Sequence, residues 1–131
     1  HILSVYPIAG TDLNTPSYQE NANAMPLNRA AMAWFLHHTT NSPANAADPR
    51  INLVSANLRG LPPVTIVAAQ IDPLRSEGEM LTERLRAAGV SVDRREYAGT
   101  THEFFGAAPL IPDATAAQAY ASGRLKAAFA K

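Results

Sequence analysis

The stretch from residue 64 to residue 97 constrains the fold most strongly. Val64–Ala69 is β-branched and almost wholly apolar, which is typical of a strand covered on both faces. In the helix expected at Arg75–Ala88, apolar or small residues recur every three or four positions, and Gly89 is well placed to end it. Val90–Tyr97 is typical of another strand, with a charged centre that favours an edge or near-edge position. A strand, a helix and a strand in succession predict a parallel βαβ unit.

The segment before this unit adds one more strand and two long polar connections. Ile2–Tyr6 is expected to be a short buried strand, which Pro7 ends. Residues 10–25 are rich in Asn, Thr, Ser and Pro, and they are expected to form a loop. Residues 39–63 are expected to be a second long connection containing at most a single helical turn, and connections of this length tend to be functional or to cross a larger body.

Two further helices complete the pattern. Asn28 is a favourable N-cap for a helix that extends to about His38, with Trp34 expected in the core. Asp113 is expected to cap a last helix that ends near Phe129. Strands and helices alternate along the chain, and no linker or repeat divides it, so we expect one α/β layered unit with about three parallel strands and flanking helices.

Composition excludes several classes of function. The formal net charge is zero, so nothing favours a nucleic acid or an anionic membrane surface as partner. There are no cysteines, which excludes disulfides and thiolate metal sites. The longest apolar stretches are far too short to span a bilayer, and no charged segment precedes an apolar signal core. We therefore expect no membrane span and a cytoplasmic location.

Two titratable residues follow the ends of the central strands. Asp72 comes just after the strand at 64–69, and His102 comes just after the strand at 90–97. In open parallel sheets, catalytic groups lie beyond the carboxyl ends of the strands, so neighbouring strands would bring both side chains to the same rim. A carboxylate that accepts the imidazole Nδ1–H fixes the tautomer and stabilises the imidazolium. Taken singly, the aspartate is as well explained as a helix or turn cap, and the histidine as a structural or solvated residue.

A second acidic group lies on the predicted helix. Glu77, Glu79 and Glu83 suggest a metal cluster at first sight. The same helix also carries Arg84 and Arg86, so we expect these carboxylates to form a solvated face and to bind no metal.

Five segments together resemble a known family. Asp72–Gly78 is similar to the D-P-L-R-D-E-G segment of bacterial hormone-sensitive-lipase-like esterases, and Tyr97–Phe105 is similar to their Y-x-G-x-x-H-x-F segment. The proline-containing lead-in at Leu61–Pro63, the W-F-x-x-H helix at Trp34–His38 and the segment Pro16–Asn21 agree as well. The resemblance covers essentially the whole chain, in order and at plausible spacing.

This resemblance implies a catalytic acid and a general base. Asp72 matches the acid of the family's Ser-His-Asp triad, and His102 matches its histidine. The chain departs from the family at Ser76, which replaces an aspartate and leaves both roles intact. Phe104 and Phe105 are candidates to line an acyl or alcohol pocket beside His102, with core packing as the alternative for one of them. No metal and no organic cofactor is implied.

The family's nucleophile and oxyanion loop are not found in these residues. The family requires a G-x-S-x-G elbow and an upstream H-G-G-type loop, whereas the chain has no Gly-Gly pair. None of its serines has glycine at both −2 and +2: Ser4, Ser17, Ser42, Ser55, Ser76, Ser91 and Ser122. The resemblance thus implies the C-terminal half of an α/β-hydrolase three-layer sandwich. Residues 1–131 would be a partial catalytic domain, containing the last three strands and their helices but no cap, oxyanion loop or nucleophile elbow.

The expected function is part of a serine carboxylic-ester hydrolase acting on a small ester, with this chain inactive by itself. One alternative is the C-terminal part of a prolyl-oligopeptidase-like peptidase, but the residues after Asp72 and His102 favour the esterase. Another is a non-catalytic binding or assembly piece with the hydrolase half-fold, and a response-regulator-like domain is a weaker one. Because strand Ile2–Tyr6 would present an apolar unpaired edge, we expect the absent N-terminal part of the same protein, or a second copy, to cover it.

Overall fold

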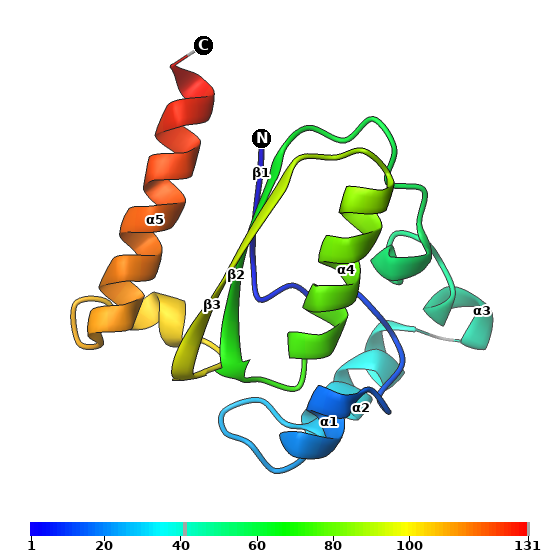
Figure 1. Cartoon of the computed structure of the whole chain (residues 1–131). Helices are drawn as coiled ribbons and strands as arrows, with labels where there is room; N and C mark the ends of the chain where they lie inside the picture. Colours follow the sequence, from blue (N-terminus) through cyan, green and yellow to red (C-terminus); the bar gives the residue numbers. More distant parts are fainter. Residues whose placement is uncertain (41, 131) are drawn as a thin grey trace.

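The computed structural model describes residues 1–40 and 42–130 and contains a three-stranded parallel sheet. The strands β1 (Ile2–Val5), β2 (Val64–Ile71) and β3 (Val92–Thr101) lie in the order β1-β2-β3. Helix α4 (Arg75–Ala87) covers one face of this sheet, and helix α5 (Pro112–Phe129) covers the other (Figure 1). This is the α/β layered architecture with about three parallel strands that the sequence predicts.

Strand β2 is the centre of the core because both of its faces are covered. Successive side chains of a strand point to opposite faces. Val64 and Ile66 accordingly belong to the apolar cluster on the α4 side, whereas Val67 and Ala69 belong to the cluster on the α5 side. Each of these four side chains is at most 3% exposed. The uninterrupted apolar run of β2 is therefore explained by helices on both sides.

Helix α4 follows the predicted periodicity. Leu74, Leu81 and Leu85 are buried, each at 5% exposure or less. Gly89 has a φ of +79°, a left-handed conformation that favours glycine directly after a helix. The chain then enters β3, which forms a parallel pair with β2 and lies at an edge of the described sheet, as its charged centre predicts.

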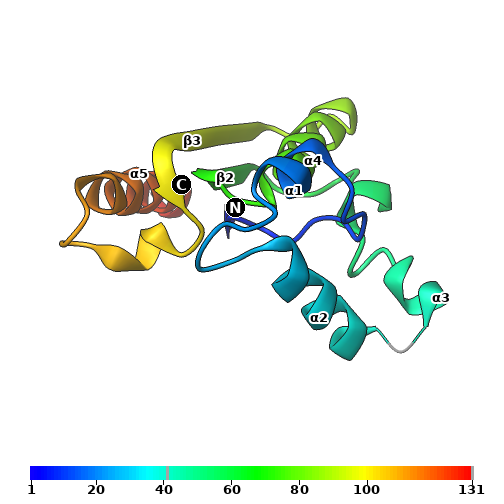
Figure 2. The ribbon, with the colours of Figure 1, turned by 90° about the horizontal axis from the view of Figure 1, so that it is seen from below.

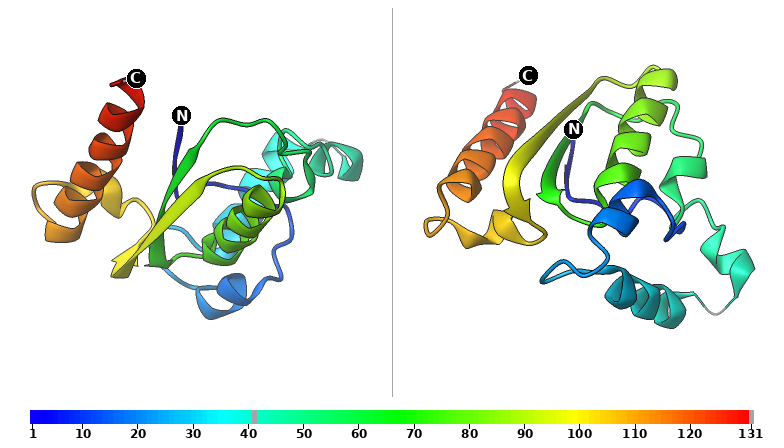
Figure 3. Two further views of the ribbon diagram at one scale, coloured as in Figure 1. Left: turned by 45° about the horizontal axis from the view of Figure 1, so that its top comes forward. Right: turned by 60° about the horizontal axis from the view of Figure 1, so that its bottom comes forward.

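Two of the smaller helices lie at the carboxyl ends of the strands. Helices α1 (Pro16–Glu20) and α2 (Arg29–Thr39) lie at the end of the sheet where the arrowhead of β2 points (Figures 2 and 3). Asn28 caps α2 as predicted, because its Oδ1 accepts a hydrogen bond of 2.9 Å from the Ala31 N–H. Helix α3 (Pro43–Ala46) and the short 3₁₀ turns η1 (Leu53–Ser55) and η2 (Phe104–Ala107) complete the chain.

The predicted polar connections are more structured than expected. Residues 10–25 contain the five-residue helix α1. Residues 39–63, apart from Asn41, which lies outside the described residues, contain both α3 and η1. Strand β3 begins two residues later and ends four residues later than its sequence pattern predicts. Of these short elements, α1 and η1 pack against α4, and such packing is not encoded in local patterns.

Two side-chain predictions are wrong. Trp34 is 59% exposed, because α2 turns Met32 toward the protein and leaves its aromatic residues outside. Asp113 lies inside the first turn of α5 and does not cap it, because the helix begins at Pro112 and Ile111 occupies the N-cap position. Proline at the first helical position has its φ already set for a helix, and α5 therefore starts two residues earlier than a cap at Asp113 would place it.

Strand β1 lies at the other edge of the described sheet. It pairs with β2 on its inner side, in a register that places Ile2 beside Val64. Ile2 is 37% exposed, and Leu3 and Val5 are partly exposed. The expectation that this strand is not a free edge is therefore not met within the described chain. That another segment of the protein, or a second copy of the chain, covers β1 stays a prediction.

Candidate active site

Asp72 lies in the first turn after β2, where the strand ends and α4 has not yet begun. Its side chain is almost fully buried at 1% exposure. The Leu74 backbone N–H donates a 2.9 Å hydrogen bond to Oδ1. The Asp72 carboxylate therefore also acts as the turn cap that the sequence left open as an alternative.

His102 faces Asp72 because of the register between β2 and β3. This register pairs Ile71 with Thr101, so the residue that follows each strand lies at the same rim of the sheet. His102 Nδ1 is 2.8 Å from Asp72 Oδ2, and the imidazole is 16% exposed. Because a carboxylate only accepts, Nδ1 carries the proton in this bond. The predicted contact between the two residues is thus present in the structure.

This arrangement leaves the other ring nitrogen free to act as a base. With the proton held on Nδ1, the lone pair of the neutral imidazole is on Nε2. Within residues 1–40 and 42–130, no hydrogen bond engages Nε2. A histidine oriented in this way by a buried carboxylate can take a proton from a hydroxyl placed beside Nε2.

Tyr6 is a site residue that the sequence analysis missed. Its ring packs on the His102 imidazole with 4.3 Å between ring centroids and an interplanar angle of 52°. Burial raises the pKa of the Tyr6 phenol, and the carboxylates of Glu103 and Asp72 raise it further. The backbone of Tyr6 has a φ of +33°, an unusual conformation for a bulky residue that concentrates at functional positions.

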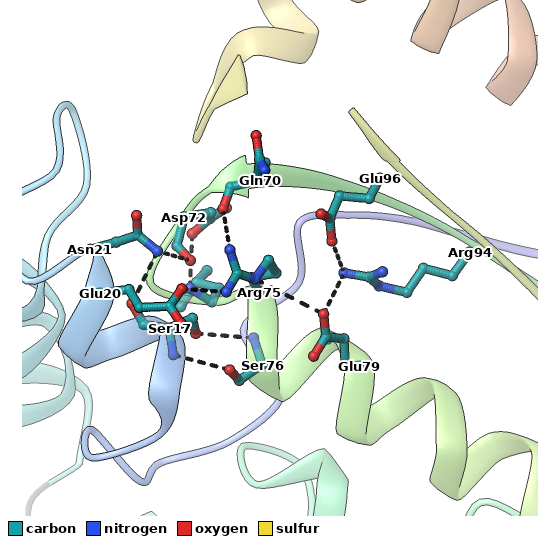
Figure 4. Close-up of polar contacts among 12 residues, drawn as sticks. Ser17, Glu20, Asn21, Gln70, Asp72, Arg75, Ser76, Glu79, Arg94 and Glu96 are labelled. Atoms are coloured by element: carbon teal, nitrogen blue, oxygen red, sulfur yellow. Dashed lines mark hydrogen bonds and ion pairs between the residues drawn. The ribbon is translucent and has the colours of Figure 1, made fainter. Parts of the chain in front are cut away.

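The turn that carries Asp72 is tied to α1 by a buried polar network (Figure 4). The Ser17 hydroxyl donates a 2.6 Å hydrogen bond to the Pro73 carbonyl and accepts one of 3.0 Å from the Ser76 N–H. The Ser17 N–H in turn donates to the Ser76 hydroxyl at 3.1 Å. Asn21 adds a bond of 3.3 Å to the Asp72 carbonyl. Ser76, the one departure from the family motif, therefore takes part in the bonds that hold the acid turn.

Ion pairs lie beside this network (Figure 4). Arg75 pairs with Glu20 of α1 and donates a 2.9 Å hydrogen bond to the Gln70 carbonyl. Arg94 of β3 lies 3.6 Å from a carboxylate oxygen of Glu79. Because Glu20 and Glu79 are half-exposed, these pairs add modest stability and mainly fix side-chain positions.

An apolar pocket of about 420 Å³ opens beside His102. His102 and Glu103 line it together with residues of α2 and of other segments. The apolar lining residues are Ile8, Pro26, Leu27, Ala31, Met32, Phe35 and Leu74. The pocket has room for an apolar group next to the imidazole.

Neither of the two phenylalanines predicted beside His102 lines this pocket. Phe104 is 3% exposed and packs in the cluster between the sheet and α5, with 5.3 Å between its ring centroid and that of Tyr97. Phe105 is partly buried against the same cluster. Core packing is the alternative expected for one of the two, and both adopt it. The reason is that η2 turns the chain toward α5 directly after His102.

Glu77 corrects the prediction of a wholly solvated acidic face. Glu79 and Glu83 are exposed as predicted, but Glu77 is only 1% exposed. Its Oε1 accepts a 2.7 Å hydrogen bond from the Ala9 N–H. A sequence signal for this burial exists, because Glu77 lies four and eight residues before the buried Leu81 and Leu85 and hence on the same helix face.

Desolvation dominates the electrostatics of Glu77. Burial raises the pKa of its carboxyl to about 7, and the charge of Asp72 also raises it, against the opposing effect of the Ala9 and Gly10 amides. The Tyr18 hydroxyl lies near enough to lower this pKa as well, although its position falls outside hydrogen-bond geometry.

In the described part of the chain, no group of three or more His, Cys, Asp or Glu side chains could hold a metal ion. Likewise, none of the described helices combines the length and apolarity needed to cross a membrane.

Comparison with protein families gives a match over most of the chain. The family model described as alpha/beta hydrolase fold matches residues 1–106. That range includes both Asp72 and His102 and ends within η2.

Curated relatives with enzyme names are similar over most of the chain. The chain is 35% identical over 128 residues to the carboxylesterase NlhH of Mycobacterium tuberculosis, which covers 95% of this chain and 40% of that protein. It is 28% identical over 111 residues to an ethyl acetate hydrolase of Pseudomonas putida, covering 84% of this chain and 35% of that protein. The chain thus spans well under half the length of these relatives.

Solved structures of esterases have the same fold in this region. EstE1, a thermostable carboxylesterase cloned from a metagenomic library, superposes with a TM-score of 0.90 at 29% identity, over 95% of this chain and 44% of EstE1. The hyperthermophilic esterase of the archaeon Pyrobaculum calidifontis superposes with a TM-score of 0.86 at 30% identity, over 92% of this chain and 41% of that enzyme.

Proposed function

This chain belongs to the alpha/beta hydrolase fold family, and we propose that it supplies the catalytic acid and histidine of a serine carboxylic-ester hydrolase. The observation that carries the proposal is the 2.8 Å hydrogen bond between buried Asp72 and His102 at the carboxyl ends of adjacent parallel strands. The esterase names of the similar proteins support this reaction class.

In the proposed mechanism, His102 acts as general base and then as general acid. Its Nε2 takes the proton of a serine hydroxyl as that oxygen attacks the ester carbonyl. The imidazolium formed is stabilised by the Asp72 carboxylate at Nδ1 and donates its proton to the leaving alcohol. Water then hydrolyses the acyl-enzyme with His102 again as the base. The serine and the oxyanion donors would come from protein outside residues 1–131.

The pocket beside His102 indicates the kind of ester. Its volume of about 420 Å³ and its apolar side chains would suit an uncharged acyl or alcohol group. Two of the curated relatives are named as a carboxylesterase and an ethyl acetate hydrolase, which fits a small ester. We therefore propose a small uncharged carboxylic ester as the substrate class.

The first test compares the 131-residue chain with a longer protein that includes the sequence encoded upstream of it. We expect no hydrolysis of a short-chain chromogenic ester by the chain alone, because a histidine–carboxylate pair has no nucleophile or oxyanion donors placed beside it. The longer protein should hydrolyse the ester and lose this activity in His102→Ala. Ester hydrolysis by the chain alone that disappears in His102→Ala would contradict the prediction that the chain alone is inactive.

The longer protein also separates the alternatives. An ester hydrolase should cleave the chromogenic ester and leave a proline-containing chromogenic peptide intact, whereas a prolyl-oligopeptidase-like enzyme would cleave the peptide. A folded longer protein that cleaves neither substrate, with or without His102, would favour a binding or assembly role.

The edge of β1 provides a further test of the same proposal. Ile2, Leu3 and Val5 are partly exposed on an edge that no other described strand pairs with, and such an edge is a template for pairing. We propose that the N-terminal part of the same protein, or a second copy of the chain, covers this strand. Light scattering with intact mass on the purified chain should give a dimer, an aggregate or a complex with a retained segment. A monodisperse monomer whose β1 amides resist hydrogen exchange would contradict this.

A further inference from the structure

The buried carboxyl of Glu77 has no part in the proposed hydrolysis, yet it holds the backbone of a segment that does contact the site. The Ala9 N–H donates a 2.7 Å hydrogen bond to Glu77 Oε1, and the Gly10 amide also faces the carboxyl. Both Ala9 and Gly10 are buried. The Ala9 carbonyl accepts a 2.9 Å hydrogen bond from the Val54 N–H, so the segment is held from both sides at this residue.

The same segment places two groups at His102. Tyr6, three residues before Ala9, packs its ring on the imidazole at 4.3 Å between centroids. Ile8, the residue directly before Ala9, lines the apolar pocket that His102 also lines. Between β1 and Ala9 the chain contains no regular element, so its path there depends on these few contacts.

We propose that Glu77 is a positioning residue: by holding the backbone at Ala9 and Gly10, it sets the Tyr6 ring against His102 and Ile8 in the pocket wall. This inference rests on the proposed function, because it assigns a role in the same site. An apolar residue at this position would leave the buried Ala9 N–H without an acceptor, which is costly. A carboxylate that receives backbone N–H bonds makes the stronger, charge-assisted kind of hydrogen bond.

The surroundings of Glu77 explain why its charge state also matters. A cavity of about 120 Å³ lies beside it, between Asn52, Thr15 and α4. Four oxygen atoms of Glu77 and nearby residues are buried without a hydrogen-bond partner in the described part of the chain: Glu77 Oε2, Tyr18 Oη, Thr15 Oγ1 and Asn52 Oδ1. The titratable groups that face Glu77 are Tyr18 of α1 and Asp72 of the acid turn, and Asp12 lines the cavity. With a pKa of about 7, the carboxyl changes charge near neutral pH and strengthens its hold on the Ala9 amide as it ionises.

The test uses nuclear magnetic resonance on the full 131-residue chain with its β1 edge covered, as a dimer or within the longer protein, and it needs no ester turnover. In the unaltered chain we expect a nuclear Overhauser contact between the Tyr6 and His102 rings and slow exchange of the Ala9 amide. Glu77→Leu should remove the ring contact and speed exchange of the Ala9 amide by about 10–100-fold, the effect of losing a hydrogen bond to a charged group. Glu77→Gln keeps an acceptor oxygen and should restore the ring contact. Glu83→Leu, on the exposed part of the same helix, is the matched control and should leave both signals unchanged.

A second measurement covers the case in which Glu77→Leu does not fold. The Ala9 and Gly10 amide shifts of the unaltered chain should titrate with a midpoint of about 7, and this titration should vanish in Glu77→Gln. Persistence of the ring contact in a folded Glu77→Leu variant, or amide shifts that do not respond to pH, would overturn the inference. An inactive longer protein with these signals intact would instead contradict only the proposed hydrolase function.

Discussion

Asp72, in the turn before α4, and Glu77, in the first turn of α4, are both 1% exposed, but their surroundings differ. Asp72 has a partner on each carboxylate oxygen, the Leu74 N–H on one and His102 Nδ1 on the other. Glu77 has the Ala9 N–H on Oε1, whereas its Oε2 is buried without a hydrogen bond from the described residues. Burial raises the pKa of Glu77 to about 7, so part of its population is protonated at neutral pH.

This contrast shows that burial by itself does not determine what a carboxyl group does. A carboxylate with donors at both oxygens can orient an imidazole and stabilise its charged form. A carboxyl that lacks a donor at one oxygen keeps much of its desolvation cost and titrates near neutrality. The two groups therefore suit different tasks, since Asp72 holds the His102 imidazole and Glu77 holds the backbone at Ala9.

The largest expected effect is that of replacing Asp72 by asparagine in a longer protein that contains the nucleophile. Asparagine has no charge and cannot hold the His102 tautomer, so kcat/KM for a short-chain ester should fall by about 10⁴-fold. Steady-state kinetics would measure this. Asp113→Asn, at an exposed position in the first turn of α5, should keep full activity. A loss of less than about tenfold in Asp72→Asn would exclude Asp72 as the triad acid.

Replacing Glu77 by glutamine should change the dependence of stability on pH. Folding raises the pKa of Glu77 from 4.5 to about 7, so its contribution is fully present below pH 4.5 and is lost as the pH rises through 7. Between pH 4.5 and pH 8, ionisation of Glu77 should therefore lower the free energy of unfolding of the unaltered chain by up to about 3 kcal/mol. This decrease should be absent in Glu77→Gln.

Denaturant unfolding of both proteins at pH 5 and pH 8 would measure this difference. The exposed Glu83→Gln should keep the pH dependence of the unaltered chain. Equal pH dependence in the Glu77→Gln variant and the unaltered chain would mean that burial does not raise the pKa of Glu77.

Removing the Ser17 hydroxyl should destabilise the turn that carries Asp72. Ser17 is fully buried, and its substitution by alanine leaves the Pro73 carbonyl and the Ser76 N–H without their partner. We expect a loss of about 2 kcal/mol in the free energy of unfolding, measured by denaturant titration. Ser122→Ala, on the exposed face of α5, is the control and should change stability by less than about 0.5 kcal/mol. An equal effect of the two substitutions would show that α1 does not stabilise the acid turn.

The smallest effect is expected for Tyr18→Phe, a substitution next to Glu77. The Tyr18 hydroxyl is buried without a hydrogen-bond partner among the described residues, so its removal should change stability by less than about 1 kcal/mol. The pKa of Glu77 should nevertheless rise further, because the hydroxyl lowers it in the unaltered chain. Carbon-13 titration of the Glu77 carboxyl would show this, with Tyr120→Phe on α5 as the control that leaves it unchanged. A pKa of Glu77 that stays the same or falls in Tyr18→Phe would contradict the prediction.

Much of the fold could be predicted because its main elements have strong local patterns. The apolar run of β2, the periodicity of α4 and the position of Gly89 are each explained by the geometry of a single element. Helix α1 was not predicted, because five residues are too few to form a stable helix without the buried bonds from Ser17 to the acid turn. The exposure of Trp34 could not be predicted either, because it depends on which side of α2 meets the rest of the protein.

The amino-acid sequence by itself determined the order of strands and helices and the placing of Asp72 and His102 directly after two neighbouring parallel strands. That much follows from local geometry, since parallel strands end at the same rim of a sheet. Only the tertiary structure decided that Tyr6 packs on His102, that Phe104 enters the core and that Glu77 is buried. The reason is that these properties depend on residues distant in the chain. Ala9 and Glu77 are 68 positions apart, and no local pattern specifies whether such groups meet or which of them loses contact with water.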